Sequence, residues 1–291
     1  MKIAILGANG HVGKVLSQQL SDLSPDLYGR LDEYLSYNDL FSREYDCIIN
    51  AVGISNGHII ASKPASFFSL IESFELLLYK YSQLFANCKV LHISSGSIFG
   101  KNTTTPISAE SSTEFYPNKL STSDVYGITK FYFEMKHQFL PYNIIDVRLF
   151  GLFSQHQSLE LPLFMSEVLD SLLHNKELLV DSNDFVRDFL CASDFGEFIK
   201  CCLKNFEKGT IDTYTRAPVS KFELLTELHK LYGLNYKVTN IDRSSLLGGV
   251  KSCYYSVNKS AGNIGYKPKY TSLEGIIKEI DLIIKNRNKN E

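Results

Sequence analysis

The sequence predicts an α/β protein: a doubly wound, Rossmann-type parallel sheet with a smaller, mixed α/β lobe at its C-terminal end. Over the first two-thirds of the chain, short apolar runs alternate with amphipathic stretches, which is the pattern of consecutive βαβ units. The first apolar run passes into a glycine-rich turn that opens a helix. After about Gly151 the alternation loosens, which predicts a lobe of different construction.

Four strands and four helices account for the regular part of this pattern. We expect strands at Lys2–Leu6, Asp46–Ala51, Lys89–Ser94 and Asn143–Leu149, and helices at Gly13–Leu20, Ala65–Leu84, Asp124–Phe139 and Leu161–His174. A full βαβ passage is missing between Leu20 and Asp46, because Asp26–Leu31 is a poor strand and little room remains for a helix. The segment Asn102–Ser123 is rich in Thr, Ser, Pro and Asn, which predicts a long surface loop.

The C-terminal part predicts a separate substrate-binding lobe. Short strands are expected at Leu178–Asp181 and Phe185–Cys191, a helix at Phe222–Leu231, and a frayed end at Lys285–Glu291. The dinucleotide-binding domain would then comprise residues 1–155 and about 184–207, and the substrate-binding lobe about 156–183 and 208–291.

Composition excludes several classes of protein. With 291 residues, 44% of them hydrophobic, the chain can bury a full core, and its formal charge of −2 gives no attraction for nucleic acid or an anionic membrane. The apolar start is too short for a signal peptide, and no apolar run reaches the roughly 18 residues of a membrane span. The six cysteines form no C-x-x-C pair, so we expect reduced core residues of a cytoplasmic protein and no metal site.

The glycine turn near the N-terminus predicts a dinucleotide site. Glycines let the chain turn tightly and let backbone N–H groups approach a pyrophosphate, while the following helix N-terminus adds a favourable dipole. The residues of this turn that we expect to contact the cofactor are Gly7, Asn9, Gly10, His11, Val12 and Gly13.

A second motif, Tyr126-Gly-Ile-Thr-Lys130, places a phenol and an ammonium group on one face of a helix. A carbonyl that accepts a hydride needs a proton on its oxygen, and a phenol is a weak acid at its ordinary pKa of about 10. A nearby ammonium favours the phenolate and brings the phenol closer to working range. The pair therefore predicts a redox enzyme with Tyr126 as the acid and a nicotinamide as the hydride carrier.

The glycine spacing, the Tyr126–Lys130 pair and the segment Leu91–Gly100 together resemble the extended short-chain dehydrogenase/reductase family, whose best-known members modify nucleotide-linked sugars. The resemblance implies three catalytic residues: Ser95, Tyr126 and Lys130. Ser95 is found by counting back from Phe99-Gly100, and it would hydrogen-bond the reacting substrate oxygen. Lys130 would also hold the nicotinamide ribose.

The resemblance extends to further contacts. For the cofactor it implies Asp39 and Leu40 at the adenine, and Asn50, Ala51, Val52, Gly53 and Ser94 beside the pyrophosphate and ribose. For the substrate it implies Ser95, Ser97, Arg148 and Arg187. Arg187 would meet the diphosphate of a nucleotide sugar, a task suited to a planar and permanently charged guanidinium.

The choice between NAD and NADP depends on residues about 20 positions after the glycine loop. Asp32 would hold an adenosine ribose and suits NAD, whereas Arg30 could meet a 2′-phosphate. We expect a slight preference for NADPH, because free-standing keto-sugar reductases of the family commonly use it.

The motifs favour reduction of a keto group, at C4, on a sugar linked to a nucleoside diphosphate. A 4-epimerase that retains NAD is the alternative enzyme. A protein that binds NAD(P) without catalysis and acts as a regulator is the hypothesis outside the enzymes. The 4,6-dehydratases of the family follow the catalytic hydroxyl with Asp-Glu, whereas this chain has Gly96 and Ser97, which argues against dehydration. The asparagine that the family places near the substrate phosphates is replaced by Gly151. A nucleotide sugar is the expected partner, and the chain is compatible with a homodimer.

Overall fold

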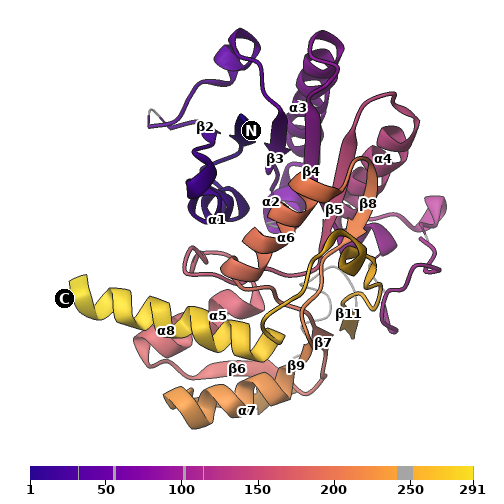
Figure 1. The fold of residues 1–291 in the computed structure, drawn as a ribbon. Helices are drawn as coiled ribbons and strands as arrows, with labels where there is room; N and C mark the ends of the chain where they lie inside the picture. The colour runs from indigo at the N-terminus through magenta and orange to yellow at the C-terminus, as the bar shows by residue number, and fades with distance from the viewer. Residues whose placement is uncertain (32, 55–56, 101–102, 114, 241–251, 291) are drawn as a thin grey trace.

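The computed structural model describes residues 1–31, 33–54, 57–100, 103–113, 115–240 and 252–290. Its largest sheet has parallel strands in the order β2-β1-β3-β4-β5-β8 (Figure 1). The strands are β1 (Ile3–Leu6), β2 (Asp26–Tyr28), β3 (Cys47–Asn50), β4 (Lys89–Ser95), β5 (Ile144–Leu149) and β8 (Gly209–Asp212). This sheet confirms the predicted α/β class.

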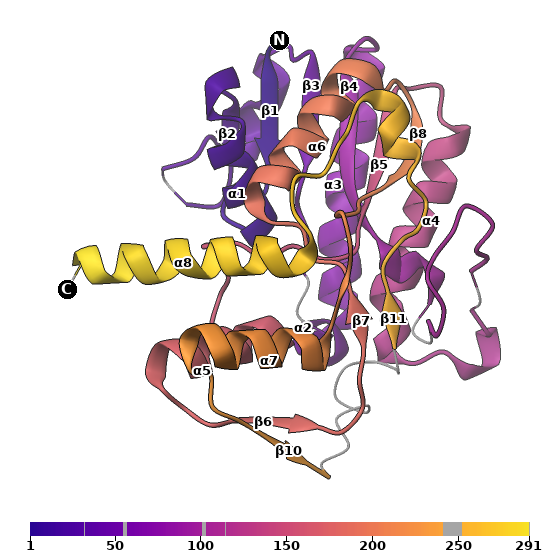
Figure 2. The same cartoon turned by 60° about the horizontal axis from the view of Figure 1, so that its bottom comes forward.

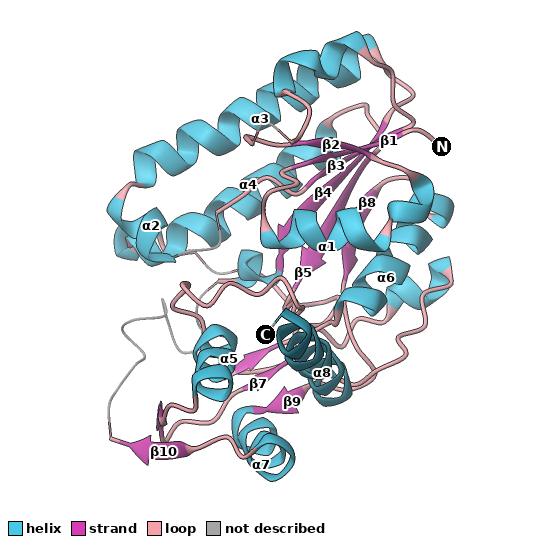
Figure 3. Ribbon diagram, turned by 90° about the vertical axis from the view of Figure 1, so that its left-hand side faces the viewer, coloured by secondary structure: helices cyan, strands magenta, loops and turns pink. Residues whose placement is uncertain are grey.

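Helices cover both faces of the sheet. They are α1 (His11–Gln19), α2 (Gly57–Ser62), α3 (Pro64–Leu84), α4 (Val125–Phe139) and α6 (Ala192–Asn205). Figure 3 shows α3 and α4 on one face and α1 and α6 on the other. Alternate side chains of β1 divide between the two cores: Ile3 and Ile5 pack with α1 and α6, and Ala4 and Leu6 pack with α3. The sheet is therefore doubly wound, as predicted.

The passage between β2 and β3 is short, as the sequence indicated. After the three residues of β2, the described residues of this passage form one helical element, the 3-10 helix η2 (Tyr37–Ser42), before the chain enters β3. Aromatic packing holds this passage, because Tyr28 and Tyr45 share a hydrogen bond of 2.7 Å and Leu40 is fully buried beside them.

The second lobe packs below the carboxyl ends of the large sheet (Figure 2). Its elements are α5 (Phe164–His174), β6 (Leu178–Asp181), β7 (Val186–Arg187), β9 (Val219–Ser220), α7 (Lys221–Tyr232), β10 (Tyr236–Thr239), β11 (Cys253–Tyr254) and α8 (Ser272–Asn290). The remaining 3-10 helices are η1 (Ser21–Leu23), η3 (Gly96–Phe99), η4 (Pro117–Lys119), η5 (Thr122–Asp124) and η6 (Ser260–Ile264). No helix in the described part of the chain has the length and apolarity needed to cross a bilayer.

Besides small shifts at the ends of several elements, three features differ from those expected. β8 pairs with β5 in the large sheet, so residues 209–212 do not belong to the substrate-binding lobe that was expected to begin at 208. β7 spans two residues instead of Phe185–Cys191, because its pairing with β9 and β11 is equally short. Most of the expected frayed end, Lys285–Glu291, continues α8 as far as Asn290, and Glu291 lies outside the described residues.

Two residues of the glycine turn must be glycine, one because of a close approach and one because of its backbone conformation. A Cβ on Gly13 would lie 2.1 Å from the carbonyl oxygen of Gly7, so α1 can pack against the turn only without a side chain there. Gly7 itself has φ of +84°, a left-handed conformation that other residues rarely adopt. Gly53, at the neighbouring strand end, has open space where a Cβ would stand.

We therefore predict that Gly13→Ala lowers the free energy of unfolding by about 1–3 kcal/mol, the usual cost of overpacking. Gly53→Ala is the matched control and should leave the free energy of unfolding nearly unchanged, because nothing lies within 4 Å of the added methyl group. Urea unfolding followed by circular dichroism measures both variants. Equal stability of the two variants would contradict the packing described for the turn.

Candidate active site

Helix α4 positions Tyr126 and Lys130. A capping box in η5 starts this region, since the Asp124 carboxylate accepts the backbone N–H of Ser121 at 2.9 Å. Gly127 lets α4 approach the end of β4, because a Cβ there would lie 2.4 Å from the carbonyl oxygen of Ser97. Tyr126 and Lys130 then lie one turn apart on the face that meets β4.

Four hydroxyl groups gather where β4 ends. The hydroxyl of Tyr254, from β11, lies 3.0 Å from Ser95 Oγ and 3.0 Å from Ser97 Oγ. Burial raises the pKa of Tyr126, the nearby Tyr254 adds to this rise, and a hydrogen bond with Ser95 opposes it. The structure thus brings together Ser95, Ser97 and Tyr126 as predicted, and it adds Tyr254, which no sequence motif indicated.

The Lys130 ammonium is buried behind Tyr126. Its side chain is 3% exposed, and Nζ donates to the carbonyl oxygen of Ile93 at 2.7 Å and lies 3.3 Å from His92 Nε2. Nζ is 6.0 Å from the centre of the Tyr126 ring. Burial lowers the pKa of Lys130 to about 8, against the attraction of nearby carboxylates, which raises it.

β4 and α4 meet through a second contact of the same kind. Ser94, two residues after His92, donates its hydroxyl hydrogen to Glu134, four residues after Lys130. Residues two apart on β4 point to the same face, and residues four apart on α4 lie one turn apart, so each of the two strand residues meets one of the two helix residues. The sequence assigned Ser94 to the cofactor, but its hydroxyl is buried and engaged by Glu134.

A cluster of buried charges surrounds His137 beneath this contact. His137 Nδ1 lies 2.8 Å from Asp146 Oδ1, and its Nε2 lies 3.1 Å from Glu75 Oε2. Burial opposes a charge on this ring, but hydrogen bonds to both carboxylates outweigh it and raise the pKa of His137 to about 9. His137 is therefore a cation that bridges two buried anions.

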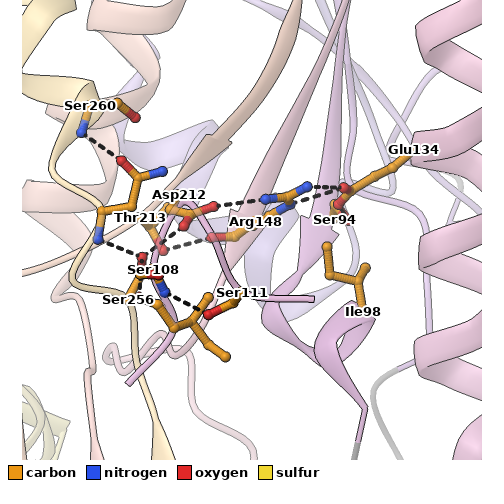
Figure 4. Close-up of polar contacts among 12 residues, drawn as sticks. Ser94, Ile98, Ser108, Ser111, Glu134, Arg148, Asp212, Thr213, Ser256 and Ser260 are labelled. Carbon is orange, nitrogen blue, oxygen red and sulfur yellow. Dashed lines mark hydrogen bonds and ion pairs between the residues drawn. The ribbon is translucent and has the colours of Figure 1, made fainter. Parts of the chain in front are cut away.

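Arg148 has a structural role in place of the substrate contact that the sequence suggested. Its guanidinium donates to Glu134 at 2.8 Å and to Asp212 at 3.4 Å, and Asp212 accepts from Ser256 at 2.7 Å (Figure 4). The arginine thus joins α4 to β8 and, through Ser256, to the C-terminal segment. Because its donors face these two carboxylates, we do not include Arg148 in the substrate site.

Arg187 lies beside the ring of Tyr254. Its guanidinium carbon is 4.7 Å from the centre of the Phe185 ring and 5.6 Å from that of Tyr254. Burial lowers the pKa of Arg187. The guanidinium thus lies near both rings, and Tyr254 connects it to the Ser95 hydroxyl. A cation in this position could receive an anionic part of a substrate, which is the role that the resemblance implied.

The glycine turn fits a dinucleotide. The backbone N–H groups of Gly7 and Ala8 donate to Tyr28 O, each at 3.0 Å, and no side-chain hydrogen bond caps α1 among the described residues. Asn9 Oδ1 accepts the N–H of Arg30 at 2.7 Å, while Asn9 Nδ2 is buried and has no partner within the described chain. An uncapped helix N-terminus beside an unsatisfied amide donor suits an oxygen-rich ligand such as a pyrophosphate and ribose.

The other cofactor residues divide into two groups. Ala51, Val52 and Gly53 follow β3 at the same sheet edge as the turn, and Asn50 supports them by accepting the N–H of Val52 at 3.1 Å. Asp39 and the side chain of Arg30 are exposed, and Asp32 lies outside the described residues. Leu40 is fully buried in the core of the β2–β3 passage, so its side chain does not face a cofactor.

Two further residues of the turn face the protein. Val12 is partly buried against the sheet core. His11 Nε2 lies 2.8 Å from Ser154 Oγ, and burial together with His156 and Lys14 lowers the pKa of His11 to about 4. His11 is therefore neutral at pH 7 and links the glycine turn to the segment that leads into the second lobe.

This combination of a doubly wound sheet, a glycine turn and a buried tyrosine–lysine pair defines a nicotinamide-dependent short-chain dehydrogenase. The chain belongs to the NAD dependent epimerase/dehydratase family, whose model matches residues 3–215. It is also similar to an uncharacterized protein of Methanocaldococcus jannaschii, with 22% identity over 299 residues that cover 98% of this chain and 89% of that protein. This membership confirms the family that the motifs predicted and the predicted class of NAD(P)-dependent enzyme.

Solved structures share the whole fold. UDP-glucose 4-epimerase from Thermotoga maritima, solved with UDP-glucose, has a TM-score of 0.81 at 16% identity and covers 99% of this chain and 100% of its own. UDP-glucuronic acid 4-epimerase from Bacillus cereus, with UDP-glucuronic acid and NAD, has a TM-score of 0.79 at 16% identity and covers 98% and 100%. dTDP-glucose 4,6-dehydratase from Bacillus anthracis, with NAD, has a TM-score of 0.76 at 16% identity and covers 99% and 98%. At these identities the likeness establishes the fold.

The His137 cluster makes stability depend on pH. The pKa of His137 is about 9 in the folded protein and near 6.5 when unfolded, so its contribution is complete below pH 6.5 and is lost as pH rises through 9. We predict that His137→Gln lowers the free energy of unfolding more at pH 6 than at pH 9.5. The difference between variant and wild type should shrink by up to about 1.4 kcal/mol per pH unit across this window.

Urea unfolding at several pH values measures this difference. His174→Gln is the control, because His174 lies on the surface, with its side chain 42% exposed, and pairs with Asp170, which is itself partly exposed. A His137→Gln penalty that is constant with pH would show that His137 is not the bridging cation.

Proposed function

We propose that this protein is a nucleotide-sugar oxidoreductase that transfers a hydride to or from a secondary carbon of the sugar. The observation that carries the proposal is the meeting of Ser95, Tyr126 and Lys130 at the carboxyl end of β4, at the same sheet edge as the glycine turn. A bound nicotinamide dinucleotide supplies the hydride chemistry. The turn, Asn9 and the strand end at residues 50–53 would hold it.

The chain's own residues would manage the proton and the position of the substrate oxygen. Tyr126 donates a proton to the oxygen as it accumulates negative charge, and Ser95 donates a hydrogen bond to the same oxygen. Lys130 stabilises the phenolate that remains, since its ammonium lies behind the Tyr126 ring. Tyr254 now occupies hydrogen-bond positions on Ser95 and Ser97, so we infer that a substrate oxygen replaces the Tyr254 hydroxyl there.

Reduction of a 4-keto sugar is our leading assignment. Gly96 and Ser97 supply no acid–base pair next to Ser95, which argues against dehydration. The short β2–β3 passage leaves little scaffold around the adenosine end, which favours a cofactor that exchanges in every cycle. An epimerase that retains NAD is the second candidate, and it is favoured by the full-length fold likeness to two 4-epimerases.

Arg187 bears on the choice of substrate, and the similar solved structures bear on the choice of cofactor. Arg187 would bind the diphosphate, displacing its contact with the Tyr254 ring. The relatives whose names include a cofactor name NAD, and nothing supports the expected preference for NADPH. Comparing kcat/KM for NADH and NADPH decides between the two.

Removing the Tyr126 hydroxyl tests the acid. Tyr126→Phe should reduce turnover of a 4-keto nucleotide sugar at least about 100-fold, the lower range of general acid–base catalysis, while NADH affinity changes little. Tyr132→Phe is the matched control on the same helix. Tyr132 is 49% exposed, so this variant should leave turnover unchanged. Turnover near wild type in Tyr126→Phe would refute the assignment.

The retention of the dinucleotide separates the two candidate reactions. For a reductase, the purified protein should carry little bound dinucleotide and should oxidise added NADH or NADPH with 4-keto-6-deoxy sugars linked to UDP, dTDP, GDP or CDP. Absorbance at 340 nm and mass spectrometry of the products measure this. Stoichiometric NAD after gel filtration, with interconversion of two nucleotide sugars in the absence of added cofactor, would establish the epimerase instead.

A further inference from the structure

The His92 ring is fully enclosed and touches polar groups through both nitrogens. Nε2 lies 3.3 Å from Lys130 Nζ. Nδ1 lies 3.2 Å from Asn50 Nδ2 and 3.6 Å from Glu75 Oε1. The side chain of His92 is 2% exposed, so these contacts are not shared with bulk solvent.

Each neutral form of this ring has its own set of partners. With the proton on Nδ1, the ring donates towards Glu75 Oε1 and accepts from the Lys130 ammonium at Nε2. With the proton on Nε2, it donates to an uncharged Lys130 amine and accepts from Asn50 Nδ2 at Nδ1. The orientation of the Asn50 amide is fixed, because its Oδ1 accepts the N–H of Val52 at 3.1 Å. The Lys130 ammonium favours the first tautomer, although its Nδ1–H then faces the Nδ2 donor of Asn50 at 3.2 Å. Loss of the charge on Lys130 favours the second tautomer, in which Nδ1 accepts from Asn50.

We propose that His92 is a positioning residue that places the Lys130 ammonium behind Tyr126 and passes protons between Lys130 and Glu75. The step moves one proton in and one out: Lys130 Nζ gives a proton to His92 Nε2, and His92 Nδ1 gives its proton to Glu75 Oε1. The ring ends as the other tautomer and carries no net charge at either end of the step. The reverse sequence restores the ammonium.

Glu75 is suited to the far end of this path. Its Oε1 is buried and has no hydrogen-bond partner in the described chain, although it faces His92. Its Oε2 lies 3.1 Å from His137 Nε2 and 3.6 Å from Lys136 Nζ, and the Lys136 side chain is 28% exposed. Glu75, Lys136 and His137 also line a small hollow on the side of α3 and α4. A proton on Glu75 is therefore near solvent.

The surroundings keep the His92 ring neutral, which a relay of this kind requires. Burial, followed by the charges of Lys130 and His137, lowers the pKa of His92 well below its usual value. Charged or titratable groups face this ring or its partners from three elements. They are Glu75 on α3, Asp146 on β5, and Lys130, Glu134, Lys136 and His137 on α4. Because Lys130 titrates near pH 8, both states of the relay are accessible around neutral pH.

The relay rests on the proposed function and deepens it. A reductase consumes one proton in each turnover, so Tyr126 must be reprotonated after it has protonated the substrate, and Lys130 is the nearest buried donor along α4. An epimerase returns its proton to the substrate side and needs no net supply. A path from Lys130 to Glu75 is thus useful chiefly to an enzyme with net proton uptake.

The tautomer of His92 is measured directly by ¹⁵N NMR on histidine-labelled protein. The chain has only seven histidines, so the His92 signals are assigned by their loss in His92→Gln, with His174→Gln as the control that should leave them unchanged. At pH 6.5 we expect the Nδ1–H tautomer in the wild type. In Lys130→Met, which removes the ammonium, we expect the Nε2–H tautomer.

In the wild type, the same change of tautomer should accompany a rise of pH through the range in which Lys130 loses its charge. The same tautomer in the wild type and Lys130→Met, together with no change in the wild type between pH 6.5 and 9.5, would overturn the proposal. Neither measurement needs a sugar substrate, so failure of the proposed function and failure of the relay are distinguishable.

Turnover provides the second measurement. His92→Gln can still accept a hydrogen bond from Lys130 but cannot relay a proton, so NADH affinity should persist while kcat falls about tenfold, below the loss expected for the acid itself. With a UDP- or dTDP-linked 4-keto sugar, the solvent deuterium isotope effect on kcat should increase in this variant. An unchanged kcat and isotope effect in His92→Gln would show that His92 only fills space.

Discussion

The buried ammonium of Lys130 is the constraint on which the rest of the main domain depends. An ammonium removed from water is costly unless hydrogen bonds and opposite charges replace its hydration. The Ile93 carbonyl and the His92 ring supply the direct contacts, while Glu75, Asp146 and Glu134 supply negative charge at longer range. Those carboxylates in turn need His137 and Arg148. The polar interior between β4 and α4 is thus one connected arrangement built around a single cation.

The two lobes meet through aromatic and hydroxyl groups more than through ion pairs. The Tyr254 hydroxyl reaches from β11 to Ser95 and Ser97 at the end of β4, and the Arg187 guanidinium of β7 lies near the Tyr254 ring. Figure 1 shows β7 and β11 side by side below the sheet. Tyr254 therefore contacts both the hydroxyls that we propose as catalytic and the arginine that we propose for the diphosphate, so a ligand that binds both must displace or pack against its ring.

The sequence was sufficient where chemistry follows local order. The glycine turn follows β1 directly, and Tyr126 and Lys130 are one helical turn apart. The positions of these motifs in the fold could therefore be predicted from their order and spacing along the chain. Arg148 and Ser94 were assigned to ligands because family position says nothing of where a side chain turns, and Glu134 attracts both. Tyr254 could not be found from sequence, because it lies 159 residues from Ser95 in a segment without periodic pattern. The same holds for His92, whose contact with Lys130 depends on the register of β4 against α4.

The short passage after β2 also covers the outer edge of the sheet against pairing with another copy of the protein. The outer edge of a sheet is a template for pairing with another chain unless its hydrogen-bonding groups are covered or kept few. β2 has only three residues, and the chain returns beside it: Leu35 donates its N–H to Leu27 O at 2.8 Å, and Gly29 donates to Leu35 O at 3.2 Å. The residues that replace a full strand–helix unit therefore shield this edge. A deletion that shortened the passage further would expose backbone groups and invite aggregation through the sheet.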